Sequence, residues 1–176
     1  MSNLQLGRMT GLAVGIVVGL ILVVVIMRAV NFNHKMKTEY DEMQRSIRGR
    51  GYKYGFYTIL IVEALFCVVS SGMDIPAVPI VVHFIPIFLG IVVQASYCIW
   101  NNAYVGLNTN MKRYIIVAVA ASLINFLAAF LAWRSGTLIS GHVIQEPFVN
   151  LLCGVMFAIL GLVALFRKAA VREVEE

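Results

Sequence analysis

Residues 54–71 read YGFYTILIVEALFCVVSS, a run that is apolar almost throughout and carries one acidic residue, Glu63, near its middle. At about 1.5 Å of rise per residue, a helix over this run approaches the roughly 30 Å thickness of a bilayer's hydrocarbon core. A carboxyl group at that depth must be protonated, bonded to another helix, or open to an aqueous cavity. The run therefore predicts a membrane-spanning helix in which burial of Glu63 in hydrocarbon carries a free-energy cost.

The composition of the chain also indicates that most of it is surrounded by lipid. Of its 176 residues, 60% are hydrophobic and only 13% are charged, and the mean hydropathy is +0.85. An ordinary soluble domain is roughly half apolar and about a quarter charged. We therefore expect an integral membrane protein whose main partner is the lipid bilayer.

Five apolar segments are long enough to cross a bilayer. The predicted spans are Met9–Val30, Tyr54–Ser71, Pro79–Trp100, Tyr114–Trp133 and Phe148–Phe166. The first is longer than the roughly 7–15 residues of a signal-peptide core, so it is predicted to be an uncleaved anchor. The expected fold is all-α, a polytopic membrane protein in which one domain, residues 1–176, forms a compact bundle of five transmembrane helices.

The distribution of basic residues predicts the orientation. Of the 14 Lys and Arg residues, only Arg8 and Arg134 fall outside the side that holds the other 12. Cytoplasmic loops are enriched in Lys and Arg, so the N-terminus is predicted outside and the C-terminus in the cytoplasm. Retention of Lys and Arg in the cytoplasmic loops accounts for the net charge of +5, so no nucleic-acid partner is expected.

Small residues predict where helices pack closely. Gly7, Gly11, Gly15 and Gly19 recur every four residues and line one stripe of the first helix. The stripe packs either on another span of the same chain, which we favour because four further helices are available, or on a second copy in a homo-oligomer. Shorter repeats of small residues occur at Ala118 and Ser122, at Ala128 and Ala132, and at Gly154 and Ala158.

The connection between the first two spans, residues 31–53, has an amphipathic pattern. Its apolar side chains at helical spacing are Phe32, Met36, Tyr40, Met43 and Ile47. Gly49 and Gly51 are expected to end this helix. One interpretation is a helix that lies on anionic lipid or docks a cytoplasmic protein partner. The other is an extension of the first span that returns the chain to the membrane.

Part of this connection resembles known sequences. Asp41-Glu42-Met43-Gln44, followed by the residues from Arg48 to Phe56, RGRGYKYGF, resembles the juxtamembrane stretch of small uncharacterised membrane proteins of Gram-positive bacteria. The resemblance covers about a tenth of the chain. It implies a bacterial plasma-membrane setting and no activity.

Three polar residues are predicted within the membrane. Glu63 and Asn125 lie at similar depth in their spans, and Gln94 lies about one turn nearer the cytoplasm. A cluster of the three supports either a proton- or cation-linked step at Glu63, or a neutral Glu63 that bonds helices together. An uncompensated carboxylate there costs about 2.5–3.5 kcal/mol, so neutral Glu63 is expected unless water reaches it.

Other chemistry finds little support in the sequence. His83, His142, Asp74 and Glu146 lie towards the outer side but lack any metal-ligand spacing, so no metal site is predicted. Pro86 permits either a kink or a broken helix of the kind that lines transporter sites. No nucleotide-binding or hydrolase motif is found, so neither a cofactor nor enzymatic activity is expected.

The sequence leaves two functional hypotheses. The first is a non-enzymatic bacterial membrane protein that acts as a scaffold, sensor or accessory subunit through its bundle and its basic cytoplasmic segment. The alternative is a small proton- or cation-coupled transporter or permeation pathway that uses Glu63.

Overall fold

The computed structural model describes residues 14, 15, 17, 18, 21, 22, 24, 25, 40–107 and 110–175. The chain divides into two compact units, Met1–Thr38 and Glu39–Glu176. The described residues of the first unit are helical and exposed, and a Cβ atom added at Gly15 would meet no described atom within 4 Å. Gly7, Gly11, Gly19, Phe32 and Met36 lie outside the described residues, so the glycine stripe stays a prediction.

The second unit is built from four long helices. They are α2 (Glu42–Gly72), α3 (Pro79–Trp100), α4 (Met111–Arg134) and α5 (Phe148–Glu175). Each of the four is long and apolar enough to cross a membrane. These helices cover four of the five predicted spans and indicate a multi-pass membrane protein.

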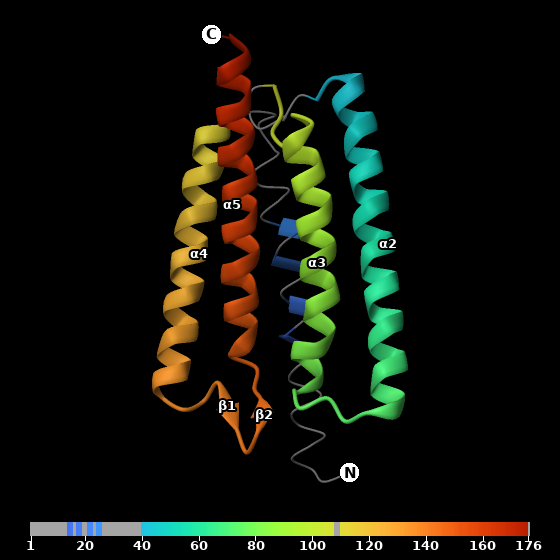
Figure 1. The fold of residues 1–176 in the computed structure, drawn as a ribbon, viewed down its shortest axis with the longest axis vertical. Helices are drawn as coiled ribbons and strands as arrows, with labels where there is room; N and C mark the ends of the chain where they lie inside the picture. The colour runs from blue at the N-terminus through green and yellow to red at the C-terminus, as the bar shows by residue number, and fades with distance from the viewer. Residues whose placement is uncertain are drawn as a thin grey trace. The chain divides into compact units, whose positions relative to one another are not determined.

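The helices of this unit pack in the order α2, α3, α5, α4 (Figure 1). Helix α2 is antiparallel to α3 and α4 is antiparallel to α5, whereas the neighbours α3 and α5 run in the same direction. The largest interfaces between described helices are α2 with α3, α3 with α5, and α5 with α4. The buried core lies between α3 and α5, where Ala95, Ile99, Met156, Leu160 and Ala164 meet. Within this unit, helix α2 therefore lies at one edge of the row and α4 at the other.

Three of the predicted small residues, Ala118, Ser122 and Gly154, lie at the α4–α5 interface. Ala118 and Ser122 are buried on α4, and the Ser122 hydroxyl donates a hydrogen bond of 2.9 Å to the Gly154 carbonyl on α5. A Cβ atom added at Gly154 would lie 2.9 Å from the Phe126 ring. The absence of a side chain at Gly154 lets the two helices approach.

Helix α2 is longer than predicted, because Gly49 and Gly51 do not end it. The side chain of Asp41 caps the helix by accepting from the Gln44 amide at 2.6 Å, and the helix then continues to Gly72. A Cβ atom at Gly51 would lie 2.7 Å from the Cys98 sulfur on α3. Glycine is thus used here for close helix packing. The second half of the amphipathic segment is the first part of a membrane-spanning helix.

Helix α3 begins at Pro79, a residue suited to a first turn because the missing N–H has no partner there. It continues without interruption through Pro86, which is buried. The alternative of a broken helix at Pro86 is therefore not observed.

A small hairpin that the sequence does not predict connects α4 to α5. Its strands, β1 (Ile139–Ser140) and β2 (Val143–Ile144), are antiparallel. Gly141 and His142 at the turn have φ values of +56° and +67°, the left-handed geometry that a two-residue hairpin turn requires. The hairpin lies at the end of the unit where α2 ends (Figure 1).

The opposite end of the unit carries the basic residues. Alternating helix directions bring together the start of α2, the end of α3, the start of α4 and the end of α5 (Figure 1). The Lys and Arg residues of these segments are Arg45, Arg48, Arg50, Lys53, Lys112, Arg113, Arg167, Lys168 and Arg172. Arg134 lies at the other end, where α4 finishes. The two ends of the unit therefore differ in basic charge among the described residues, and the side of a membrane that each end faces stays a prediction.

Candidate functional site

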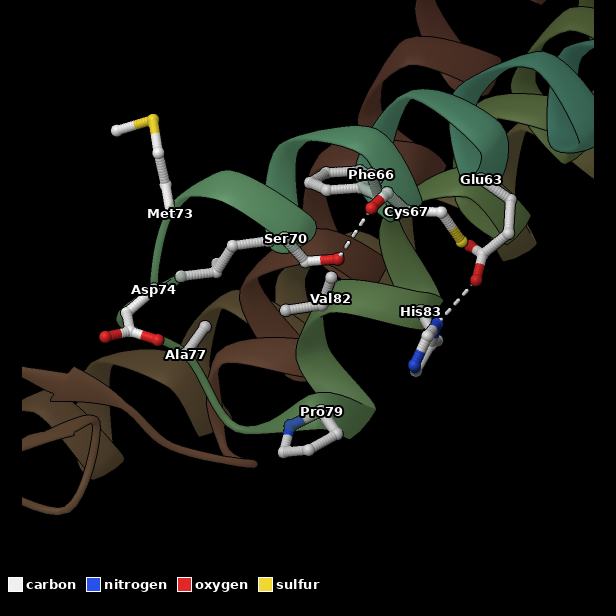
Figure 2. Close-up of a pocket in the computed structure, with 11 residues that line it drawn as sticks. Glu63, Phe66, Cys67, Ser70, Met73, Asp74, Ala77, Pro79, Val82 and His83 are labelled. Atoms are coloured by element: carbon white, nitrogen blue, oxygen red, sulfur yellow. Dashed lines mark hydrogen bonds and ion pairs between the residues drawn. The ribbon is translucent and has the colours of Figure 1, made fainter.

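The clearest polar contact between membrane-spanning helices joins Glu63 of α2 to His83 of α3. The Glu63 Oε1 and His83 Nδ1 atoms are 2.7 Å apart (Figure 2). This distance suits a hydrogen bond in which the proton is on either the nitrogen or the oxygen. The pair can therefore hold, accept or release a proton at one place between two helices.

A cavity of about 280 Å³ lies beside this pair, between the last turns of α2 and the first turns of α3. Figure 2 shows its lining side chains, with Glu63 and His83 towards one end and Asp74 towards the other. The remaining lining residues are mostly apolar: Phe66, Cys67, Ser70, Met73, Ile75, Ala77, Pro79 and Val82. The site is therefore a largely apolar groove with ionisable groups at both ends.

The loop between α2 and α3 forms the floor of this cavity and is held by the hairpin. The Val78 amide donates to the Ile144 carbonyl at 2.9 Å, and the Ile144 amide donates to the Pro76 carbonyl at 2.9 Å. Ala77, which lines the cavity, lies between these two bonds. Strand β2 thus holds the loop that leads into the first turns of α3, where His83 lies.

The Glu63–His83 pair is not covered by the other helices of the unit Glu39–Glu176. The side chain of His83 is 60% exposed and that of Glu63 is 35% exposed. Both residues lie in helices that are apolar enough to cross a membrane. An ionisable pair at such a position is expected to face a cavity, water or another protein segment, because lipid offers no hydrogen bonds.

The other two members of the predicted polar cluster are not brought to Glu63. The Asn125 amide donates to the Ala121 carbonyl of its own helix, α4, at 2.8 Å. Helix α4 lies at the edge of the row opposite α2. Gln94 is nearer, since its Cβ atom lies 2.9 Å from the position of a Cβ at Gly55, but it packs about two turns of α2 before Glu63.

The sequence identifies Glu63 but not its partner. His83 stands out in the sequence only as one of four scattered residues that lack metal-ligand spacing. The signal that points to the pair is the short connection from Met73 to Val78, which makes α2 and α3 antiparallel neighbours. A glutamate on the first of these helices and a histidine on the second can then meet across the α2–α3 interface.

A metal centre finds no support within the described residues, where no three His, Cys, Asp or Glu side chains are grouped to hold an ion. Cys67 and Cys98 lie in α2 and α3 and Cys153 lies in α5, and all three are free thiols.

The predicted amphipathic residues that the structure describes have different environments. Ile47 is buried with 7% exposure, and Met43 is exposed. The Tyr40 hydroxyl donates to the Tyr104 carbonyl at 3.3 Å and accepts from Arg48 at 3.0 Å. Met43 therefore remains free at the surface, whereas Tyr40 and Ile47 stabilise the fold.

Comparison of the chain with protein-family models, curated proteins and solved structures finds no match in any of the three.

Proposed function

We propose that this chain is a non-enzymatic, multi-pass protein of a bacterial plasma membrane that works as an accessory subunit or scaffold for another membrane protein. The observation that carries the proposal is the exposed Glu63–His83 pair on the surface of α2 and α3. A polar pair at lipid depth favours a protein neighbour that completes its hydrogen bonds.

The position of α2 supports a docking role for this surface. Helix α2 lies at the edge of the row, and only 6% of its most apolar window is buried, against 28% for α3 and for α5. Leu60, Ile61 and Leu65 are exposed close to Glu63. A partner helix on this face would cover the polar pair and the apolar side chains around it.

In this proposal the basic end of the bundle faces the cytoplasm, because positively charged loops are retained on that side. The tyrosines near this end agree, since Tyr54 and Tyr97 form one ring pair and Tyr104 and Tyr114 another, and such rings favour the membrane–water interface. The bacterial setting rests on the resemblance of residues 41–56 to small membrane proteins of Gram-positive bacteria.

Site-specific crosslinking tests the accessory role. A photoreactive amino acid at Leu60, one turn before Glu63, is expected to give an adduct of discrete mass in cells. The same probe at Ile124, an exposed position on α4, is the matched control and is expected to give none. The adduct at position 60 is expected to disappear with Glu63→Gln, which keeps the shape of the side chain and removes its charge.

Equal adducts at positions 60 and 124, or an adduct at position 60 that survives Glu63→Gln, would remove the proposal. The first result would indicate collisions within the membrane, and the second would indicate a contact that does not use the polar pair.

A second candidate function is a proton- or cation-linked pathway, favoured by the cavity beside Glu63. Its lining includes Glu63, His83 and Asp74, so a cation that enters from the Asp74 end would meet the proton-binding pair. Because the bundle is small, an oligomer is the expected form. This candidate requires a proton or cation flux in liposomes that Glu63→Gln abolishes, and unchanged flux in that variant rules it out.

A further inference from the structure

We infer that the α2–α3 cavity binds a small organic cation, an ammonium group that carries apolar substituents. This inference concerns binding alone and requires neither a partner helix nor flux across a membrane. It follows from the size of the cavity, the charge of its lining and the chemistry of its walls.

The size of the cavity limits the ligand. A water molecule occupies about 30 Å³ in the liquid, so 280 Å³ holds on the order of ten non-hydrogen atoms. That space suits one small ring with a substituted ammonium group. It is too small for a lipid or a peptide to be enclosed.

The charge of the lining selects a cation. The lining holds the carboxyl groups of Glu63 and Asp74 and no Lys or Arg. At this end of the described helices the one Lys or Arg is Arg134, on α4, which lies across the row from α2. An anion in the cavity would face two carboxylates with only His83 to compensate them.

The two carboxyl groups have different roles in this arrangement. One oxygen of Glu63 contacts His83, which leaves the other oxygen available as a counter-ion for the ligand. Figure 2 shows the Asp74 carboxylate at the far end, pointing away from Glu63. Asp74 therefore attracts cations to the mouth of the cavity, and Glu63 binds the ammonium group inside it.

The walls select an organic cation over a metal ion. Metal ions such as Mg²⁺ and Ca²⁺ need several oxygen ligands or retained waters. Within the described residues no group of three potential ligands exists, and the walls of the cavity include Phe66, Ile75 and Val82. Such side chains favour apolar substituents, and the Phe66 ring adds an aromatic surface that attracts ammonium groups.

Calorimetry on the full chain in lipid nanodiscs tests this inference, with benzyltrimethylammonium as the probe. Its neutral isostere, neopentylbenzene, in which carbon replaces nitrogen, is the matched ligand control. We expect saturable binding of the cation and no displacement by the isostere. Glu63→Gln is expected to weaken binding by about tenfold or more, since it removes the opposite charge nearest the ammonium group. Asp74→Asn is expected to cause a smaller loss that fades as salt is added.

Two further variants keep the test independent of folding defects. Glu146→Gln removes a carboxyl group from the same end of the unit but not from the cavity, and it is expected to leave affinity unchanged. Ser70→Leu fills the cavity at an exposed residue that bonds only to the Cys67 carbonyl, and it is expected to abolish binding with both carboxylates intact.

The inference is overturned if the wild-type protein does not bind the probe, if Glu63→Gln or Ser70→Leu binds it as the wild type does, or if the neutral isostere displaces it. Absence of the adduct at position 60 in the wild-type protein, with cation binding intact, would count against the accessory-subunit proposal alone.

Discussion

Arg48 connects more of the basic end than any other side chain described there. Its guanidinium donates to the carbonyls of Ala103 and Tyr104 at 3.3 and 3.2 Å, and it lies 4.2 Å from the centre of the Tyr40 ring. Ala103 is fully buried in the loop that joins α3 to α4. One residue of α2 therefore positions the loop between two other helices.

Replacing Arg48 with Ala is expected to lower the free energy of unfolding by about 2 kcal/mol, because two carbonyls lose a charged donor. Denaturant titration in nanodiscs measures the change. Arg45→Ala, an exposed arginine one turn earlier, is the control and is expected to stay within about 0.5 kcal/mol of wild type. If the two variants lost equal free energy of unfolding, the positive charge of this end, and not the contacts of Arg48 with the loop, would account for the stabilisation.

Glu63 shows how far residue-level prediction extends. Its cost in an apolar run is visible in the sequence, because hydrocarbon cannot solvate a carboxylate. Its partner is not visible, since pairing depends on the direction in which each helix faces. Asn125 has a suitable depth and chemistry but lies on a helix at the far edge of the row, whereas His83 lies on the adjacent helix.

At the scale of elements, glycines determine how closely α2 approaches α3. A Cβ atom at Gly55 would lie 2.8 Å from the Gly90 carbonyl, and one at Gly90 would meet the side chain of Ile59. A Cβ atom at Gly51, one turn earlier on α2, would meet the Cys98 sulfur on α3. These contacts form the seam that carries the Glu63–His83 pair further along the same two helices.

Gly90→Ala is expected to destabilise the protein by about 1–3 kcal/mol, because the added methyl group forces the helices apart. Gly49→Ala is the matched control: a Cβ atom there meets nothing within 4 Å, so alanine should stabilise the helix by about 0.5–1 kcal/mol. Denaturant midpoints of the two variants, measured against wild type, should move in opposite directions. If the midpoints of both variants moved in the same direction, α2 and α3 would not be packed closely at these glycines.

The elements themselves were largely predictable. The predicted span Pro79–Trp100 has the same bounds as α3, and α4 and α5 contain the spans predicted for them. The start of α2 at Glu42 is not predictable in this way, because Gly49 and Gly51 also fit residues that end a helix. Glycine has the same low helix propensity in both roles, and only the position of α3 shows that Gly51 serves packing.

At the scale of the molecule, the order of the helices was not predictable. Side chains that face lipid and side chains that face a neighbouring helix are equally apolar, so the sequence of a span does not show which face is buried. The row of α2, α3, α5 and α4 comes from particular contacts, such as Ser122 with Gly154 and Gly51 with Cys98. The division of basic residues between the two ends was predictable, because it depends only on the number and direction of the spans.

In the proposed topology these helices cross a membrane with the basic end in the cytoplasm. Labelling of single cysteines in intact cells with a membrane-impermeant maleimide tests it most directly. The three native cysteines are first replaced by alanine, and one cysteine is then placed at the exposed positions Lys112 or Ser140, at opposite ends of α4. Ser140→Cys is expected to react in intact cells, and Lys112→Cys only after the membrane is permeabilised. Reaction of both positions in intact cells, or of Lys112→Cys alone, would contradict the account.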